Sequence, residues 1–254
     1  MPRIKQSATG WSFIQEDLTA ENFIRTAAEI GFAAVEMVDQ KYWPLAWDLG
    51  LKISALIGHQ SLSDGLNKRE NHNRIENEIL LNIDLAAAND IPVVLTFSGN
   101  QYEGLSYNEG IEVTAAGLSR VSKAAEEKNI TLCLELLNTK VDHPGYQGNS
   151  TAWGVEVCKH VNSPRVKLLY DIYHMQIMEG DIIRTIQENI EYIGHFHTAG
   201  NPGRNNLDAQ QEIYYPPIIS AIVKTGYDQY IAHEFIPKSN PIEGLRQAFH
   251  LCNV

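Results

Sequence analysis

Four segments in the second half of the chain each end an apolar run on a side chain that can bind a metal ion. The final residues are Glu135, Asp171, His197 and Glu234, at intervals of 36, 26 and 37 residues. One strand with its return helix takes about 30 residues, so the intervals approximate one ligand per strand–helix unit. Three carboxylates and one imidazole suit a hard or borderline divalent cation, Mn2+ or Mg2+, with Zn2+ or Co2+ as alternatives. The spacing therefore predicts a divalent-metal site at the mouth of a barrel of parallel strands.

Each of these four residues, taken alone, has an ordinary explanation as a salt-bridged or surface side chain. Four such residues in register across consecutive units are much harder to explain in that way. Glu135 and Glu234 also follow strands so apolar that the two side chains should be partly buried. A buried carboxylate needs a charged partner, hydrogen bonds or a metal ion.

Strand-like and helix-like runs alternate along the whole chain, which favours an α/β fold. Eight strand–helix pairs are the number that a closed (β/α)8 TIM barrel requires, and 254 residues is close to its usual length of about 250. We therefore predict a TIM barrel that forms a single domain over residues 1–254. The predicted strands are 4–8, 33–38, 52–57, 92–97, 130–137, 166–172, 192–197 and 230–235, and the predicted helices are 19–30, 41–49, 71–89, 108–128, 151–160, 181–189, 215–224 and 241–252.

Composition and charge narrow the class of protein. The formal net charge is −11, which argues against a nucleic-acid partner, because neutralising phosphates needs clustered lysine and arginine. Cys133, Cys158 and Cys252 are odd in number and scattered, so we expect free thiols. The N-terminal segment lacks the apolar stretch of a signal peptide, and no run approaches the roughly 18 apolar residues of a membrane span. We expect a cytoplasmic protein with no membrane partner.

Five segments carry a resemblance to a known family. They contain Glu-Leu-Leu-Asn, Tyr-Asp-Ile-Tyr-His-Met-Gln, Gly-His-Phe-His-Thr-Ala-Gly-Asn-Pro-Gly-Arg, Gln-Glu-Ile-Tyr-Tyr and His-Glu-Phe, and they lie at 135–138, 170–176, 194–204, 211–215 and 233–235. These segments resemble those of the hydroxypyruvate isomerases. That family is a branch of the xylose isomerase-like barrel superfamily, which also contains ketose 3-epimerases and endonuclease IV. The resemblance covers most of the chain and is strongest from residue 131 onward.

The resemblance implies roles for the four candidate ligands. In the superfamily, the residues that match Glu135, Asp171, His197 and Glu234 bind one divalent metal. The residues that match the two glutamates also move protons, one removing a proton from carbon and the other returning it. The metal would stabilise a cis-enediolate of a small hydroxycarbonyl substrate or sugar. Related proteins are often dimers or tetramers, so a homo-oligomer is a further expectation.

Five other residues are candidates for substrate contact or support. His174 matches a histidine that contacts substrate oxygens in the epimerases, with a hydrogen-bonded loop histidine as the alternative. Arg204 could bind a substrate carboxylate or hydroxyl in a forked contact, or anchor its loop through Asp208. His59 could touch the substrate or have a supporting or surface role. Trp11 could line the substrate site or pack in the core. Glu212 could orient His197 or Arg204, or it could be a carboxylate favoured by the dipole at a helix N-terminus.

Several functions remain open. The leading prediction is a metal-dependent isomerase that interconverts a small hydroxy-aldehyde and hydroxy-ketone, as hydroxypyruvate isomerases do. The alternative is a ketose 3-epimerase, since the best-known hydroxypyruvate isomerases carry glutamine where this chain has His197, whereas the epimerases carry histidine. The turn that ends at Arg204 resembles the isomerase branch. The pair of glutamates argues against a non-catalytic sugar-binding barrel. The acidic net charge argues against an endonuclease IV-like phosphodiesterase.

Overall fold

The structure is a computed structural model that describes residues 4–254. Residues 1–3 belong to the N-terminal segment in which we expected no signal peptide, and they lie outside the described residues. The chain divides into two compact units, each built from separate stretches of sequence. The first unit holds the residues up to Ser54, Asp181–Ile190 and Phe196–Val254, and the second holds Ala55–Gly180 and Glu191–His195. The expectation of one domain over residues 1–254 stays a prediction.

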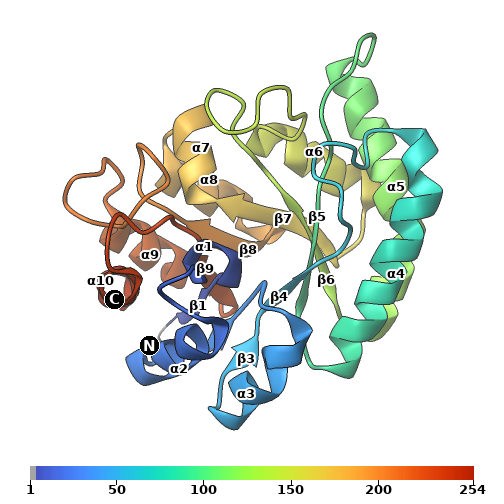
Figure 1. Ribbon diagram of the computed structural model, residues 1–254. Helices are drawn as coiled ribbons and strands as arrows, with labels where there is room; N and C mark the ends of the chain where they lie inside the picture. Colours follow the sequence, from blue (N-terminus) through green and yellow to red (C-terminus); the bar gives the residue numbers. More distant parts are fainter. Residues whose placement is uncertain (1–3) are drawn as a thin grey trace. The chain divides into compact units, whose positions relative to one another are not determined.

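Parallel strands and helices alternate in the second unit (Figure 1). Its elements are β4 (Ala55–Ile57), η2 (Arg69–Asn71), α4 (His72–Ala88), β5 (Val93–Thr96), α5 (Tyr107–Lys128), β6 (Thr131–Glu135), α6 (Thr151–Val161), β7 (Val166–Asp171), α7 (Ile172–Met178) and the start of β8 (Ile193–Thr198). The strands pair in the order β4, β5, β6, β7 and β8. Helix α5 packs against both α4 and α6. All carboxyl ends of these parallel strands therefore meet at one edge of the sheet.

The first unit contains both the beginning and the end of the chain. Its elements are β1 (Lys5–Ala8), α1 (Gly10–Phe13), α2 (Ala20–Ile30), β2 (Ala34–Val35), η1 (Gln40–Tyr42), α3 (Trp43–Asp48), β3 (Lys52–Ile53), α8 (Ile182–Asn189), the end of β8, α9 (Tyr215–Lys224), β9 (Tyr230–His233) and α10 (Pro241–Cys252); η3 (Ile190–Tyr192) runs from this unit into the other. Strand β9 pairs in parallel with β1 on one side and with β8 on the other. Strands β2 and β3 form a second parallel pair.

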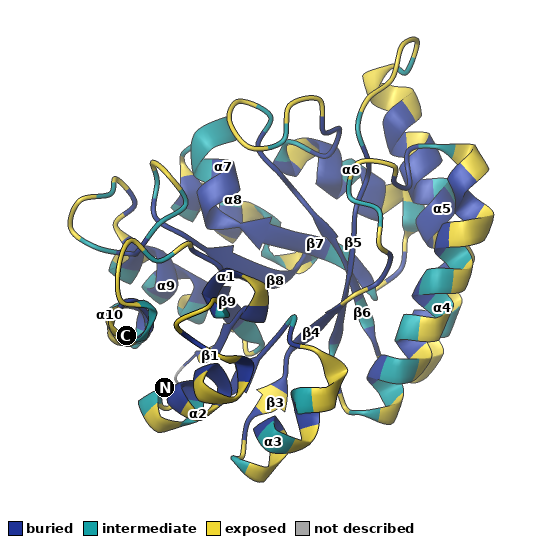
Figure 2. Cartoon of the chain, in the orientation of Figure 1, coloured by how far each residue is buried: buried dark blue, intermediate teal, exposed yellow. Residues whose placement is uncertain are grey.

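Most strand residues are buried, and the helices are exposed on their outer faces (Figure 2). All four residues of β5 are buried, as expected of a parallel strand covered on both faces. Fully burying one Val or Leu side chain stabilises a fold by about 1.5–3 kcal/mol, so these runs account for much of the driving force. Among the described residues, no helix combines the length and the apolar character that crossing a bilayer would need.

Both ends of helix α2 are stabilised by residues suited to those positions. The Thr19 side chain accepts a hydrogen bond from the backbone N–H of Asn22 at the start of α2, and Gly31 ends that helix with φ of 106°. This left-handed conformation costs little only without a Cβ. The helix expected at 19–30 therefore begins after a threonine cap and ends at a glycine.

Two features differ from the sequence-based expectation. The strand expected at 52–57 is two strands, because β3 pairs with β2 and β4 pairs with β5, with Ser54 between them. A further helix, α7, begins directly after β7, where we expected the strand to continue to Ile172. Asp171 explains this change, since its Oδ1 accepts hydrogen bonds from the backbone N–H groups of Tyr173 and His174 at 2.8 and 3.2 Å. The side chain that ends the strand therefore also caps the helix.

Candidate metal and substrate site

Glu234 follows β9 in the first unit and is 4% exposed. Nε1–H of Trp11 donates a hydrogen bond to its Oε1 at 2.7 Å, and Arg204 donates from Nη2 to Oε2. Nδ1 of His197 lies 3.0 Å from the same Oε2. Burial alone would raise the pKa of Glu234, but the nearby charges of His197 and Arg204 and the hydrogen bonds hold it well below its usual range. Glu234 is therefore a buried, ionised carboxylate.

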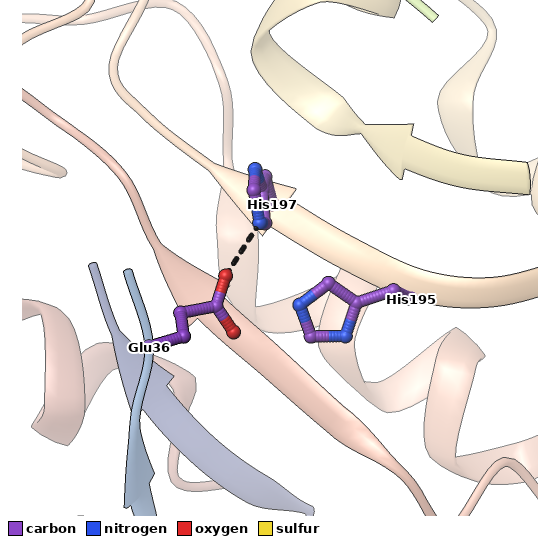
Figure 3. A group of neighbouring side chains, drawn as sticks. All are labelled: Glu36, His195 and His197. Atoms are coloured by element: carbon purple, nitrogen blue, oxygen red, sulfur yellow. Dashed lines mark hydrogen bonds and ion pairs between the residues drawn. The ribbon is translucent and has the colours of Figure 1, made fainter. Parts of the chain in front are cut away.

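His197 lies on β8 and is fully buried between two carboxylates of the first unit. Its Nδ1 faces Glu234, and its Nε2 lies 2.9 Å from Oε1 of Glu36. Figure 3 shows Glu36 and His197 directed toward one another, with His195 two residues earlier on the same strand. Oε2 of Glu36 accepts a hydrogen bond from Oγ–H of Ser54 at 2.6 Å. Both ring nitrogens of His197 are therefore oriented by carboxylates.

Glu36 is a site residue that sequence reasoning missed. It lies inside the apolar run 33–38, which we predicted as a strand without assigning any side chain a role. The structure ends β2 at Val35, and the fully buried Glu36 comes immediately afterwards. It thus occupies a strand end, as Glu135 and Glu234 do. In the sequence, however, Met37 and Val38 continue the apolar run past Glu36, so the criterion that selected the four ligands did not select it.

Arg204 and Trp11 form a pair beside Glu234. The guanidinium carbon of Arg204 lies 5.2 Å from the centroid of the Trp11 ring, a cation–π arrangement. Arg204 ends a tight turn in which Gly203 and Arg204 both have positive φ and Asn201-Pro202 is a cis peptide. The guanidinium at the end of this turn donates to the carboxylate of Glu234. The alternative in which Arg204 pairs with Asp208 is not what the structure has, because Asp208 pairs with Lys238 at 2.9 Å.

The second unit holds the other two predicted ligands. Glu135 is the last residue of β6 and Asp171 the last of β7, and they are 5% and 0% exposed. The backbone carbonyl of Glu135 accepts a hydrogen bond from Tyr146 Oη at 3.0 Å, and that hydroxyl accepts one from the N–H of Ser98 at 2.9 Å. Burial raises the pKa of Tyr146, so the phenol stays protonated. The end of β6 is thus fixed by a buried tyrosine.

His174 is fully buried on the first turn of α7. Its Nδ1 accepts hydrogen bonds from the backbone N–H of Asn138 at 3.3 Å and from the Asn138 amide at 2.7 Å. The amide is oriented because its Oδ1 accepts from the N–H groups of Val141 and Asp142, both at 3.0 Å. Since Nδ1 is an acceptor, the ring proton of neutral His174 lies on Nε2. That nitrogen lies 3.6 Å from Oδ2 of Asp171.

Two predicted residues have other surroundings. His59 is buried against Phe97, whose N–H donates to His59 Nε2 at 3.0 Å, and it lines a cavity of about 930 Å³ with residues of β4 and α4. Burial lowers the pKa of His59 to about 4. Glu212 is exposed and accepts a hydrogen bond from the Asn201 amide, so it supports the turn that carries Arg204. Substrate contact by His59 and orientation of His197 or Arg204 by Glu212 stay predictions.

Buried acidic and histidine side chains of the described residues form groups that could hold a metal ion. Their composition fits a divalent cation, because carboxylate oxygens dominate and imidazole adds a borderline nitrogen ligand. Buried carboxylates are costly without such a partner or strong hydrogen bonds. The donor set therefore agrees with the metal expected from the sequence.

Comparison with known proteins supplies the wider context. A family model described as "Xylose isomerase-like TIM barrel" matches residues 24–252. The chain is 35% identical over 128 residues to 2-oxo-tetronate isomerase of Cupriavidus necator, covering 50% of this chain and 48% of that protein. It is 32% identical over 120 residues to hydroxypyruvate isomerase of Escherichia coli, covering 47% of this chain and 46% of that protein. The matched regions thus span about half the length of these relatives.

A solved structure of L-ribulose 3-epimerase is similar over nearly the whole chain. The TM-score is 0.79 at 20% identity, and the match covers 98% of this chain and 93% of that one. At this identity the similarity shows the fold alone. It agrees with the alternation of parallel strands and helices described above.

Proposed function

Because the chain belongs to the xylose isomerase-like TIM barrel family, we propose that it is a metal-dependent isomerase. The proposed reaction interconverts a small hydroxy-aldehyde and a hydroxy-ketone that carry a carboxylate, as in hydroxypyruvate. Two similar proteins carry the names 2-oxo-tetronate isomerase and hydroxypyruvate isomerase. Both names contain an acid that carries an oxo group and at least one hydroxyl group. The observation that carries the proposal is the buried, ionised Glu234, which is engaged by His197 and Arg204.

Four residues are the proposed ligands of one divalent ion. They are Glu135 and Asp171 from the second unit and His197 and Glu234 from the first. The burial of each of these side chains and the arrival of each at or directly after the end of a strand support the proposal. Mn2+ or Mg2+ suits the three carboxylates, and Zn2+ or Co2+ would tolerate the imidazole equally well. When bound, the ion would stabilise negative charge that develops on the carbonyl and hydroxyl oxygens of the substrate.

Glu135 and Glu234 are the proposed proton carriers. A C–H beside a carbonyl is a weak acid, so a base must lie close to it while negative charge develops on oxygen. One glutamate would take the proton from carbon, giving a cis-enediolate. The hydroxyl proton would pass to the former carbonyl oxygen, and the other glutamate would protonate the neighbouring carbon. Ionised Glu234 is in the protonation state that a base requires. Its hydrogen bonds from Trp11 and Arg204 would fix the direction in which the carboxylate points.

Arg204 is the proposed recognition element for the carboxylate of the substrate. A guanidinium presents paired N–H donors that match a carboxylate in a forked, charge-assisted contact. The Trp11 ring beneath Arg204 limits its movement while leaving its edge able to donate. A neutral ketose would not make this ionic contact, so Arg204 favours an acid substrate.

A ketose 3-epimerase is the second candidate function. His197 supports it, because histidine at this position resembles the epimerase pattern. An epimerase would use the same two glutamates on a different carbon of its substrate. The two candidates therefore differ in substrate and in the position of exchange, and not in the residues that act.

Hydrogen exchange would separate the two candidates. The protein, loaded with Mn2+ or Mg2+, would be incubated in D2O with hydroxypyruvate and, separately, with free ketoses, and NMR would locate the deuterium. We expect deuterium at the carbon next to the carbonyl of hydroxypyruvate. Exchange at C3 of a ketose, without exchange in hydroxypyruvate, would establish the epimerase instead. Metal binding without exchange in any of these substrates would contradict both and favour a non-catalytic sugar-binding barrel.

A further inference from the structure

We propose that Glu36 is a positioning residue that holds the His197 imidazole in the orientation and tautomer needed to bind the metal through Nδ1. The inference rests on the proposed function, since it concerns the same metal site. It adds a fifth residue, which directly follows β2 and would act through His197. It also assigns a task to a buried carboxylate that the proton-transfer chemistry does not use.

The contacts of Glu36 favour this role. Oε1 of Glu36 lies 2.9 Å from Nε2 of His197, and both residues are fully buried. The other oxygen, Oε2, accepts from Ser54 Oγ at 2.6 Å, and Ser54 Oγ lies 2.7 Å from Ser7 Oγ. These four side chains belong to the first unit, and all are 0% exposed. A hydrogen bond from Ser54 therefore fixes Oε2 of Glu36, while Oε1 faces the His197 ring.

The backbone around Glu36 is fixed as well. Its N–H donates to the carbonyl of Ala8 at 3.0 Å, and its carbonyl accepts from the N–H of Gly10 at 2.7 Å. A Cβ at Gly10 would lie 2.6 Å from Val38 Cγ1 and 2.8 Å from the carbonyl oxygen of Met37. Only glycine permits this close approach. Glu36 consequently has little freedom to move away from His197.

The chemistry of a histidine ligand requires such a partner. An imidazole gives the lone pair of one nitrogen to a metal and keeps a proton on the other, and the acceptor of that proton sets the ring orientation and the tautomer. With Nε2–H donating to Glu36, a bound metal would replace the proton on Nδ1 that faces Glu234, which is itself a proposed ligand. A carboxylate acceptor also increases the electron density that the ring offers.

Glu36→Gln is the decisive variant, because it keeps the shape and an acceptor oxygen but removes the charge. Isothermal titration calorimetry with Mn2+ should show a dissociation constant about 10–100-fold higher than that of wild type. Ser54→Ala, which keeps the carboxylate but removes one of its supports, should weaken binding less. Glu179→Gln is the matched control, because Glu179 also accepts two hydrogen bonds, from N–H and Oγ1 of Thr151, but is exposed. Its affinity for Mn2+ should equal that of wild type.

A measurement without metal separates this proposal from the proposed function. NMR of metal-free protein labelled with 15N-histidine should show His197 ring shifts that change in Glu36→Gln and not in Glu179→Gln. Wild type that binds no Mn2+ would overturn the proposed function. Wild type that binds Mn2+, with equal affinity in folded Glu36→Gln, would overturn the role of Glu36 alone. If Glu36→Gln does not fold, Ser54→Ala decides, and unchanged affinity and ring shifts in that variant would overturn the role.

Discussion

Charged side chains contact His197 and Glu234 in the first unit, whereas backbone N–H groups and a side-chain amide donate hydrogen bonds to Asp171 and His174 in the second unit. Glu36 and Arg204 supply the charges in the first unit. Backbone N–H groups and the Asn138 amide make the contacts in the second. Hydrogen bonds to charged groups contribute about 1.5–3 kcal/mol and neutral ones about 0.5–1.5 kcal/mol. Substitutions around the first pair should therefore have larger effects than substitutions around the second.

The difference also separates two tasks. In the first unit the neighbours set the charge state of a carboxylate, since they hold the pKa of Glu234 low despite its burial. In the second unit the neighbours set geometry, since one oxygen of Asp171 caps α7 and Asn138 fixes the His174 tautomer. The predictions that follow test this division, beginning with the substitutions in which the two units should behave alike.

Glu135→Gln and Glu234→Gln should each abolish hydrogen exchange with solvent, although the two glutamates have different neighbours. Each change keeps the shape of the side chain and removes the group that accepts the proton. General acid–base catalysis contributes about 10²–10⁴-fold, so the rate of deuterium incorporation should fall by at least about 100-fold. Circular dichroism would verify that each variant is folded. Exchange retained in either variant would remove that glutamate from the proton-transfer role.

Arg204→Gln should lower kcat/KM for hydroxypyruvate by about 10–100-fold, through the loss of a charge-assisted contact. Any turnover of a neutral ketose should fall much less. Arg204→Lys keeps the charge but not the forked geometry and should have an intermediate effect. Steady-state kinetics on both substrate classes provide the measurement. An equal loss on acid and neutral substrates would show that Arg204 acts through Glu234 and not on the carboxylate of the substrate.

Asn138→Ala should have a smaller effect, because it removes one neutral hydrogen bond to Nδ1 of His174 and leaves the backbone donor in place. We expect kcat to fall about 2–10-fold, with little change in metal affinity. Steady-state kinetics and Mn2+ titration of the same preparation would test both statements. A loss of metal affinity as large as that expected for Glu36→Gln would contradict the division between the two units.

Much of the fold could be predicted from sequence, because apolar runs of strand length recur at intervals that leave room for one helix. All eight predicted strand regions contain strands. The division of the third at Ser54 could not be predicted, since it depends on which distant strand each half pairs with. Helix α7 was missed because Asp171 ends a strand and caps a helix at once. The division at Ser54 thus depends on distant contacts, whereas the cap of α7 is a local signal carried by a residue already assigned to the strand.

The candidate site was predictable to a similar degree. The chain places the four predicted ligands at or directly after strand ends in buried surroundings, although their joint role remains a proposal. Glu36 escaped because its partner His197 is 161 residues away. A single glutamate in an apolar run gives no sign of that partner. His59, which follows the third predicted strand by two residues, packs against Phe97 in the structure.

The smallest predicted effect concerns stability and one buried histidine in each unit. Burial lowers the pKa of His233 to about 3 and that of His59 to about 4, against about 6.5 in an unfolded chain. Below pH 6.5 the unfolded state therefore binds more protons than the folded state, so this stability is complete above that pH and is lost as the pH falls. Each histidine should lower the free energy of unfolding by at most about 1.4 kcal/mol per pH unit. Urea unfolding between about pH 7 and pH 5, above the carboxylate range, should show a shallower pH dependence in His233→Gln and in His59→Gln than in wild type. If neither variant differs from wild type in slope, these histidines are not the groups that couple folding to pH.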